Sequence, residues 1–526
     1  MNTVNKIFWI TIFGSLIIGK VNAQCDSLKE ATFDKNVQLQ HAGVPQVMDP
    51  WEPSPPPDTN EVRRIYFIHG LGGSVSSWEK TAQACQYKYL RLDTIGFPAR
   101  KCETTLLNYA DRTRNLLGAT KAIREEAGSI YFQAAADRDI GINHPTSPEA
   151  NYLNPARAII IAHSQGGLIA RQLMHLDLVA DTGNSTLKNG LNYGGVVTIA
   201  SSVQGAAILA NRHKILELAN DGCNKLLLGP FYDVEKKVNI NLNMGGFAGW
   251  VLSTFNVGDK LTTQVQSVLR KLLNNILPTV CDAATDNLMP MFFKQHYAGI
   301  TEDYNPASPT NKINMLNSDT NSAKYRKFPK VSFYAVEPQD NIMWRTLNWM
   351  VTKEPNDADY FQANDDWELY YDMISPLINF YQSRSNQIYA DYLVAYNDLT
   401  TSKYLDINKY YRKMDLERGG LAWKEGLDWF YNANESWQTI IGARVQNGNT
   451  VTYKPDNDGI VLAESAAGLP YAQKVIKIEA TKKKGNFTLI TGSSHMQVRN
   501  DEGIRKALKD LLDGKHGDWF YTAPQP

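Results

Sequence analysis

Residues 158–173 read AIIIAHSQGGLIARQL, and this stretch decides the fold. It begins with an apolar run without polar alternation, which is typical of a strand buried on both faces of a parallel sheet. From Leu168 onward the apolar residues recur at helical spacing. Ser164 lies between the two patterns and is followed by Gly166 and Gly167. The stretch therefore predicts a sharp strand-to-helix turn with a serine at its apex.

Buried-strand patterns recur along the chain. Apolar runs at 65–68 and 195–200 are also followed by small residues and a helical pattern, and a further run lies at 331–336. Strands that alternate with helices predict an α/β fold with a mostly parallel, doubly wound sheet. Later elements are predicted in this order: strands at 439–442, 474–478 and 487–490, and a final amphipathic helix at 503–512.

The spacing of these patterns indicates how the chain is organised. Residues 205–325 and 367–430 read mainly as helices, which predicts a large insertion within the α/β core. We divide the chain into a signal peptide at 1–23, a Pro-rich segment at 24–60, a first core part at 61–204, a helical cap or lid insertion at 205–435 with a core-type strand near 331–337, and a second core part at 436–526.

The N-terminus and the charge balance bear on location and partners. Lys6, the apolar run 7–18 and the small residues before position 24 predict a cleavable signal peptide, and therefore a secreted or periplasmic protein. An uncleaved anchor helix is the alternative, although the run is short for a bilayer span. The 54 Lys and Arg residues balance 54 Asp and Glu residues, so no excess of positive charge indicates nucleic-acid binding.

The five cysteines of an exported chain permit two disulfides and one unpaired thiol. Proximity in the sequence favours the pairs Cys85–Cys102 and Cys223–Cys281. Cys25 is not expected to carry a lipid, because Gln24 is not the small residue that such processing needs.

The motif around Ser164 indicates nucleophilic chemistry. A serine on a strained turn between strand and helix holds its hydroxyl clear of the sheet, beside a helix N-terminus that stabilises negative charge. An earlier strand ends in HGLGG at 69–73. Acyl transfer needs two convergent N–H groups for the oxyanion, and we expect those of Leu71 and Gln165. A plain glycine-rich turn is the alternative, and a nucleotide P-loop is excluded because no Gly-Lys-Ser/Thr follows.

With these motifs the sequence resembles the lipase and esterase branch of the α/β-hydrolase superfamily, which includes bacterial triacylglycerol lipases, the lecithin–cholesterol acyltransferase group and the GPI-inositol deacylases. The resemblance rests on residues 69–73, 164–167 and 202–206, and it extends from 308–317 to the strand near residue 331. It implies an α/β-hydrolase fold in which the acid and the histidine follow the serine in chain order. Residues 340–435 have no counterpart in the resemblance.

The resemblance implies His495 as the base and Asp458 as the acid that orients it. His495 lies in GSSHM at 492–496, which resembles the terminal histidine loop of the branch. Asp458 lies in NDGIV at 457–461, which looks like the Asp-Gly-hydrophobic-Val signature of these lipases, although an Asp-Gly pair is also a common plain turn. Asp340, which follows a predicted strand, is the alternative acid.

Together these residues predict a secreted serine hydrolase that cleaves carboxylic esters of lipids or other hydrophobic acyl groups through an acyl-enzyme intermediate. Ser164 would be the nucleophile, and this chemistry requires neither a metal nor an organic cofactor. An acyltransferase or amidase with the same triad is one alternative. A non-catalytic hydrolase-fold binding module is the other.

The insertion bears on the substrate. Apolar side chains within it are expected either to line an acyl channel or to form the core of the cap itself, and they are Phe247, Trp250, Val251, Leu252 and Phe255. The expected partner is therefore a hydrophobic acyl ester, with contact to a lipid surface through the cap. The sequence leaves the oligomeric state open.

Overall fold

The structure is a computed structural model that describes the main sheet and the longest helices. The described residues are 63–71, 75–78, 81–82, 102–107, 120, 123, 158–180, 193–237, 303, 312–319, 325–326, 328–339, 341–351, 374–404, 406–484 and 488–522. Predictions that lie outside these residues concern the signal peptide at 1–23, the Pro-rich segment at 24–60, the apolar cap residues between 247 and 255, Asp340, and the cysteines Cys25, Cys85 and Cys281. Each predicted disulfide has one member outside the described residues, so both pairings stay predictions.

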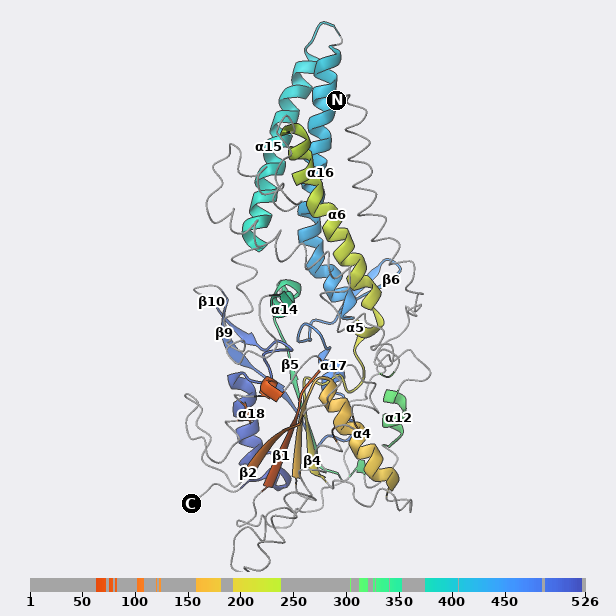
Figure 1. Cartoon of the computed structure of the whole chain (residues 1–526), viewed down its shortest axis with the longest axis vertical. Helices are drawn as coiled ribbons and strands as arrows, with labels where there is room; N and C mark the ends of the chain where they lie inside the picture. Colours follow the sequence, from red (N-terminus) through yellow and green to blue (C-terminus); the bar gives the residue numbers. More distant parts are fainter. Residues whose placement is uncertain are drawn as a thin grey trace, which may run out of the picture.

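Six parallel strands form the main sheet, which confirms the predicted α/β class (Figure 1). The spatial order is β2-β1-β3-β4-β5-β8, so the direction of winding reverses between β1 and β3. In open α/β sheets, the carboxyl ends of the two strands at such a reversal border a crevice where ligands bind. The strands are β1 (Arg63–Ile68), β2 (Cys102–Leu107), β3 (Ala158–His163), β4 (Tyr193–Ile199), β5 (Lys330–Ala335) and β8 (Lys474–Ile478).

Helices cover both faces of the main sheet, which is why its strands are apolar without alternation. Successive side chains of a strand point to opposite faces. Ile160 therefore belongs to the core under α4 (Gln165–Ala180), whereas Ile161 belongs to the core under α18 (Glu502–Leu512). Figure 1 shows these two helices on opposite sides of the sheet. The predicted final helix at 503–512 is confirmed by α18.

Long helices of the insertion form a projection that rises from the sheet (Figure 1). Gly222 of one helix permits close approach to another, because a Cβ there would lie 2.4 Å from a ring carbon of Trp429. Gly229 and Trp423 repeat this arrangement two turns along. The helices described between the core strands are α5 (Ala207–Ala210), α6 (Arg212–Lys237), α12 (Lys312–Ser318), α14 (Ile342–Val351), α15 (Ser375–Thr400) and α16 (Ile407–Ile440).

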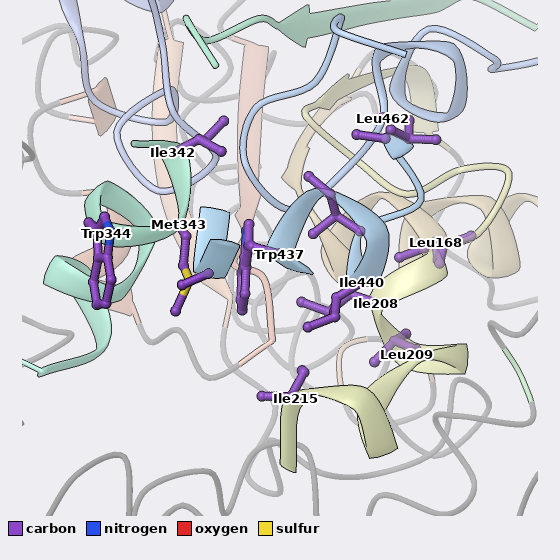
Figure 2. Packing of buried hydrophobic residues seen from close by; sticks show 14 of the residues in the cluster. Leu168, Ile208, Leu209, Ile215, Ile342, Met343, Trp344, Trp437, Ile440 and Leu462 are labelled. Carbon is purple, nitrogen blue, oxygen red and sulfur yellow. The ribbon is translucent and has the colours of Figure 1, made fainter. Parts of the chain in front are cut away.

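The base of this projection packs directly on the core. Figure 2 shows Ile208 of α5 and Ile440 of α16 close to Leu168 of α4, and these three residues belong to the same buried cluster as Trp344 of α14 and Trp437 of α16. The buried indole N–H of Trp437 donates to the Gly459 carbonyl at 2.9 Å. The insertion is therefore continuous with the hydrophobic core beside the carboxyl ends of the strands.

The prediction of a strand at 439–442 is wrong. Helix α16 continues to Ile440, and Ile441 caps it with its N–H bonded to the Trp437 carbonyl. A short apolar run does not distinguish a strand from the end of a buried helix, and here Trp437 and Ile440 continue the helical spacing. The helix therefore also crosses the domain boundary predicted at 436. A two-stranded hairpin follows, formed by β6 (Arg444–Asn447) and β7 (Thr450–Tyr453).

The later predicted strands are present, but only one joins the main sheet. The prediction at 474–478 is confirmed by β8. The run predicted at 487–490 forms β10 (Thr488–Gly492), which pairs antiparallel with β9 (Ala480–Lys484) in a sheet of two strands. The remaining short helices are η1 (Val75–Trp78), α17 (Ala463–Ala466) and η11 (Asp518–Phe520). Among the described residues, no helix combines the length and apolar character needed to cross a membrane.

Candidate active site

Ser164 occupies the turn between β3 and α4, as predicted. Its φ is 54°, in the left-handed region that non-glycine residues rarely adopt. The surroundings hold this conformation: the Ser164 N–H donates to the Ile199 carbonyl at 3.1 Å, and the Gly167 N–H donates to the Ser164 carbonyl at 3.1 Å. The Ser164 side chain is half-buried, at the carboxyl end of a central strand. Ser164 therefore lies at the carboxyl end of a strand beside the reversal, which is the position where open α/β sheets bind ligands.

The two glycines after the serine allow the close packing of this turn. A Cβ at Gly166 would lie 2.6 Å from the Ile68 carbonyl oxygen of β1. A Cβ at Gly167 would lie 2.5 Å from the Ser201 Cβ, in the turn after β4. Both distances are shorter than van der Waals contact, so a larger residue at either position would push α4 away from the sheet.

His495 links the serine to the predicted acid. Its Nε2 lies 2.9 Å from the Ser164 Oγ, and its Nδ1 lies 2.8 Å from the Asp458 Oδ2. The side chains of His495 and Asp458 are 5% and 1% exposed. A carboxylate at Nδ1 selects the tautomer that carries its proton there, which leaves Nε2 free to accept the serine proton.

The Asp458 carboxylate is fixed by the turn that follows it. Its Oδ1 accepts the N–H groups of Ile460 at 3.0 Å and Val461 at 2.7 Å, while Oδ2 faces the histidine. Gly459 adopts a φ of 95°, which favours glycine at this position. The His495 N–H donates to the Asp458 main-chain carbonyl at 2.8 Å. The acid and the histidine are therefore joined through both main chain and side chain.

The end of β5 supports both loops. The Glu337 N–H donates to the Asn457 carbonyl at 2.8 Å, and the Ser493 N–H donates to the Val336 carbonyl at 3.1 Å. Glu337 itself forms a buried ion pair of 2.5 Å with Arg345 of α14. The segment that follows β5 therefore aligns the acid loop with the histidine loop. Sequence reasoning missed Glu337, although its position directly after a buried strand was a signal for a structural or functional carboxylate.

A second histidine, His163, lies behind the first. Its Nε2 donates to the His495 carbonyl oxygen at 2.8 Å, and the centroids of the two imidazole rings are 4.8 Å apart. Burial, followed by the nearby charges of His495 and Arg499, holds the pKa of His163 well below its usual value, so the ring is neutral. Sequence reasoning did not assign His163 a role, although it adjoins Ser164 in the motif.

The predicted oxyanion residues lie just after β1 and β3, the two neighbouring strands between which the direction of winding reverses. Leu71 follows β1 and Gln165 opens α4. The β1 loop passes directly against the serine, because a Cβ at Gly70 would lie 2.7 Å from the Ser164 Cβ and 3.3 Å from its Oγ. The structure thus brings together Ser164, His495 and Asp458, with the proposed oxyanion segments beside them.

The described residues contain no group of three or more His, Cys, Asp or Glu side chains arranged to hold a metal ion. The chain matches no model of a known protein family and no curated protein.

Proposed function

We propose that this protein is a secreted serine hydrolase with an α/β-hydrolase fold, which cleaves carboxylic esters of lipids or other hydrophobic acyl groups. The observation that carries the proposal is the unbroken chain of contacts from Ser164 Oγ through His495 to Asp458. The strained φ of Ser164, at the carboxyl end of a central parallel strand, supports the same role. Secretion and the preference for apolar esters rest on the sequence.

In the first half of the reaction, His495 Nε2 takes the hydroxyl proton as Ser164 Oγ attacks the ester carbonyl carbon. Asp458 stabilises the imidazolium that forms. The N–H groups of Leu71 and Gln165 stabilise the negative oxygen of the tetrahedral intermediate, and removal of one such donor typically costs about 3–4 kcal/mol. The intermediate collapses when His495 returns its proton to the leaving alcohol, which leaves the acyl group on Ser164.

The second half of the reaction releases the acid. His495 takes a proton from water, and the hydroxide attacks the acyl carbonyl carbon. The second intermediate expels Ser164 Oγ, which regains a proton from His495. The starting enzyme and a free carboxylic acid result.

A fluorophosphonate probe tests the nucleophile. We expect the purified protein to be labelled, the Ser164→Ala variant to be unlabelled, and the Ser383→Ala variant to be labelled like wild type, since Ser383 is an exposed serine of α15. Absence of labelling, or labelling that survives Ser164→Ala, would overturn the proposal. Hydrolysis of nitrophenyl esters of increasing chain length then measures the acyl preference, and a preference for the shortest chain would contradict the proposed substrate class.

A further inference from the structure

Helix α16 of the insertion reaches the turn that carries the proposed acid. It runs from the outer part of the projection to its base, where its last turn packs on the core (Figure 1). The indole of Trp437 in this last turn is buried, and its N–H donates to the Gly459 carbonyl at 2.9 Å. Gly459 directly follows Asp458. A helix of the insertion therefore contacts the acid turn through a hydrogen bond.

This contact bears on the carboxylate through a single peptide group. The Gly459 carbonyl and the Ile460 N–H belong to the same peptide group, which is planar and points the two to opposite sides. The indole holds the carbonyl, and on the other side the N–H donates to the Asp458 Oδ1 at 3.0 Å. Trp437 therefore fixes the orientation of a donor that holds the carboxylate.

The hydrogen bond from the indole matters because a glycine occupies this position. Gly459 has a φ of 95°, and glycine restricts the rotation of its peptide groups less than any other residue. Rotation of the 459–460 peptide would turn the carbonyl oxygen, in place of the N–H, toward the carboxylate. Because these oxygens repel each other, Asp458 would lose its position at His495. A donor on the Gly459 carbonyl opposes this rotation.

A second side chain of α16 supports the residue before the acid. Asn434 lies three residues before Trp437, and side chains at this spacing are neighbours on the surface of a helix. The Asn434 Nδ2 donates to the Gln339 carbonyl at 3.2 Å, and its Oδ1 accepts the Met343 N–H at 3.1 Å. The Asn457 Nδ2 donates to the Gln339 Oε1 at 2.9 Å. One end of α16 thus supports the acid turn by two routes.

Another tryptophan of the same helix provides a comparison. Trp423 is as buried as Trp437, but its indole N–H has no hydrogen-bond partner among the described residues. It lies about 21 Å from Trp437 along the helix axis and packs against Gly229 of α6. Trp423 therefore contributes packing alone, whereas Trp437 contributes packing and a hydrogen bond to the acid turn.

We propose that Trp437 is a positioning residue for the acid: its indole N–H holds the 459–460 peptide, so that the Asp458 carboxylate stays at the His495 Nδ1. This role rests on the proposed hydrolysis, because it concerns a reaction at the serine. It makes the end of α16 part of the structure that holds the catalytic groups in place.

The second-order rate of fluorophosphonate labelling of the full-length protein tests this role. We expect Trp437→Phe to lower the rate by about tenfold, because phenylalanine donates no hydrogen bond and small displacements of reacting groups slow a reaction steeply. Trp423→Phe is the matched control. It makes the same replacement at a buried site of α16 without removing a hydrogen bond, so its rate should lie within about twofold of wild type. Circular dichroism and the melting temperature show that each variant is folded.

Asp458→Asn distinguishes a positioning role from a purely structural one. In this background the carboxylate that Trp437 positions is absent, so adding Trp437→Phe should change the slow residual rate by less than about twofold. A general defect of the fold would instead lower the rate by the same factor in both backgrounds. If Trp437→Phe does not fold, Asn434→Ala takes its place, with an expected fall of about three- to tenfold that is absent in Asp458→Asn.

Two results would overturn the positioning role while the proposed hydrolysis stands. One is labelling of the folded variant within about twofold of the wild-type rate. The other is an equal fall in the labelling rate with and without Asp458→Asn. Wild-type protein that the probe does not label would overturn the proposed hydrolysis, and the positioning role with it.

Discussion

Gly70→Ala tests the geometry of the site without replacing any residue that takes part in the proposed reaction. Gly70 is not among the residues with positive φ, so its backbone conformation accommodates alanine. The new Cβ would lie 2.7 Å from the Ser164 Cβ and 3.0 Å from the His163 Nδ1. Ordinary contact begins near 3.4 Å, so the serine or the β1 loop must move by about 0.7 Å.

A movement of this size disrupts the proton transfer. The Ser164 Oγ to His495 Nε2 distance is 2.9 Å, and an added displacement of about 0.7 Å would take it beyond hydrogen-bonding range. Misplacement of reacting groups by about 1 Å can cost roughly 10²-fold in rate. We therefore expect Gly70→Ala to lower the second-order rate of fluorophosphonate labelling by about 10- to 100-fold, with a folded protein.

Gly420→Ala is the matched control. A Cβ at Gly420 of α16 would meet Ile388 Cγ2 at 3.8 Å, which is ordinary contact, and alanine in a helix is favoured over glycine by about 1 kcal/mol. Its labelling rate should equal that of wild type and its melting temperature should not fall. If folded Gly70→Ala is labelled within about twofold of the wild-type rate, the close approach of the β1 loop to the serine does not govern the site.

Three further predictions concern the groups around the serine. Asp458→Asn should lower kcat by roughly 10⁴-fold with little change in fold, because the orienting carboxylate at His495 is lost; a loss below about tenfold in ester hydrolysis would contradict its role. The depressed pKa of His163 keeps the folded ring neutral, while the unfolded ring takes up a proton near the ordinary histidine pKa of 6.5. The contribution of the neutral ring to stability is thus fully present above about pH 6.5 and is lost as the pH falls toward the folded pKa. Urea unfolding between about pH 7.5 and 5 should therefore show a smaller fall in the free energy of unfolding for His163→Gln than for wild type. The same dependence of the unfolding free energy on pH in both proteins would refute this. Arg345→Met should destabilise the chain by about 3–5 kcal/mol, because it removes the cation of the buried ion pair with Glu337. Adding Glu337→Leu should restore much of this stability. Thermal unfolding of both variants measures the effect, and a double variant that is no more stable than the single variant would contradict the prediction.

The core strands and the serine turn could be predicted because their signals are local. A buried parallel strand needs a continuous apolar run, and a sharp turn into a helix needs small residues after the serine, so a few neighbouring residues carry the information. The same local signal failed at 439–442, where an apolar run ends a helix. The buried side chains from Trp429 to Ile440 recur at helical spacing, and only this longer window indicates that the run ends a helix.

The meeting of the site residues depends on the tertiary structure. Ser164 and His495 are 331 residues apart, and strand order and register bring their side chains together. An Asp-Gly turn predicts its own bend but not the neighbour its carboxylate will reach, so only the folded chain places Asp458 at His495. The support from His163 and from the end of β5 could not be read from the sequence either, since each contact joins segments that are distant along the chain.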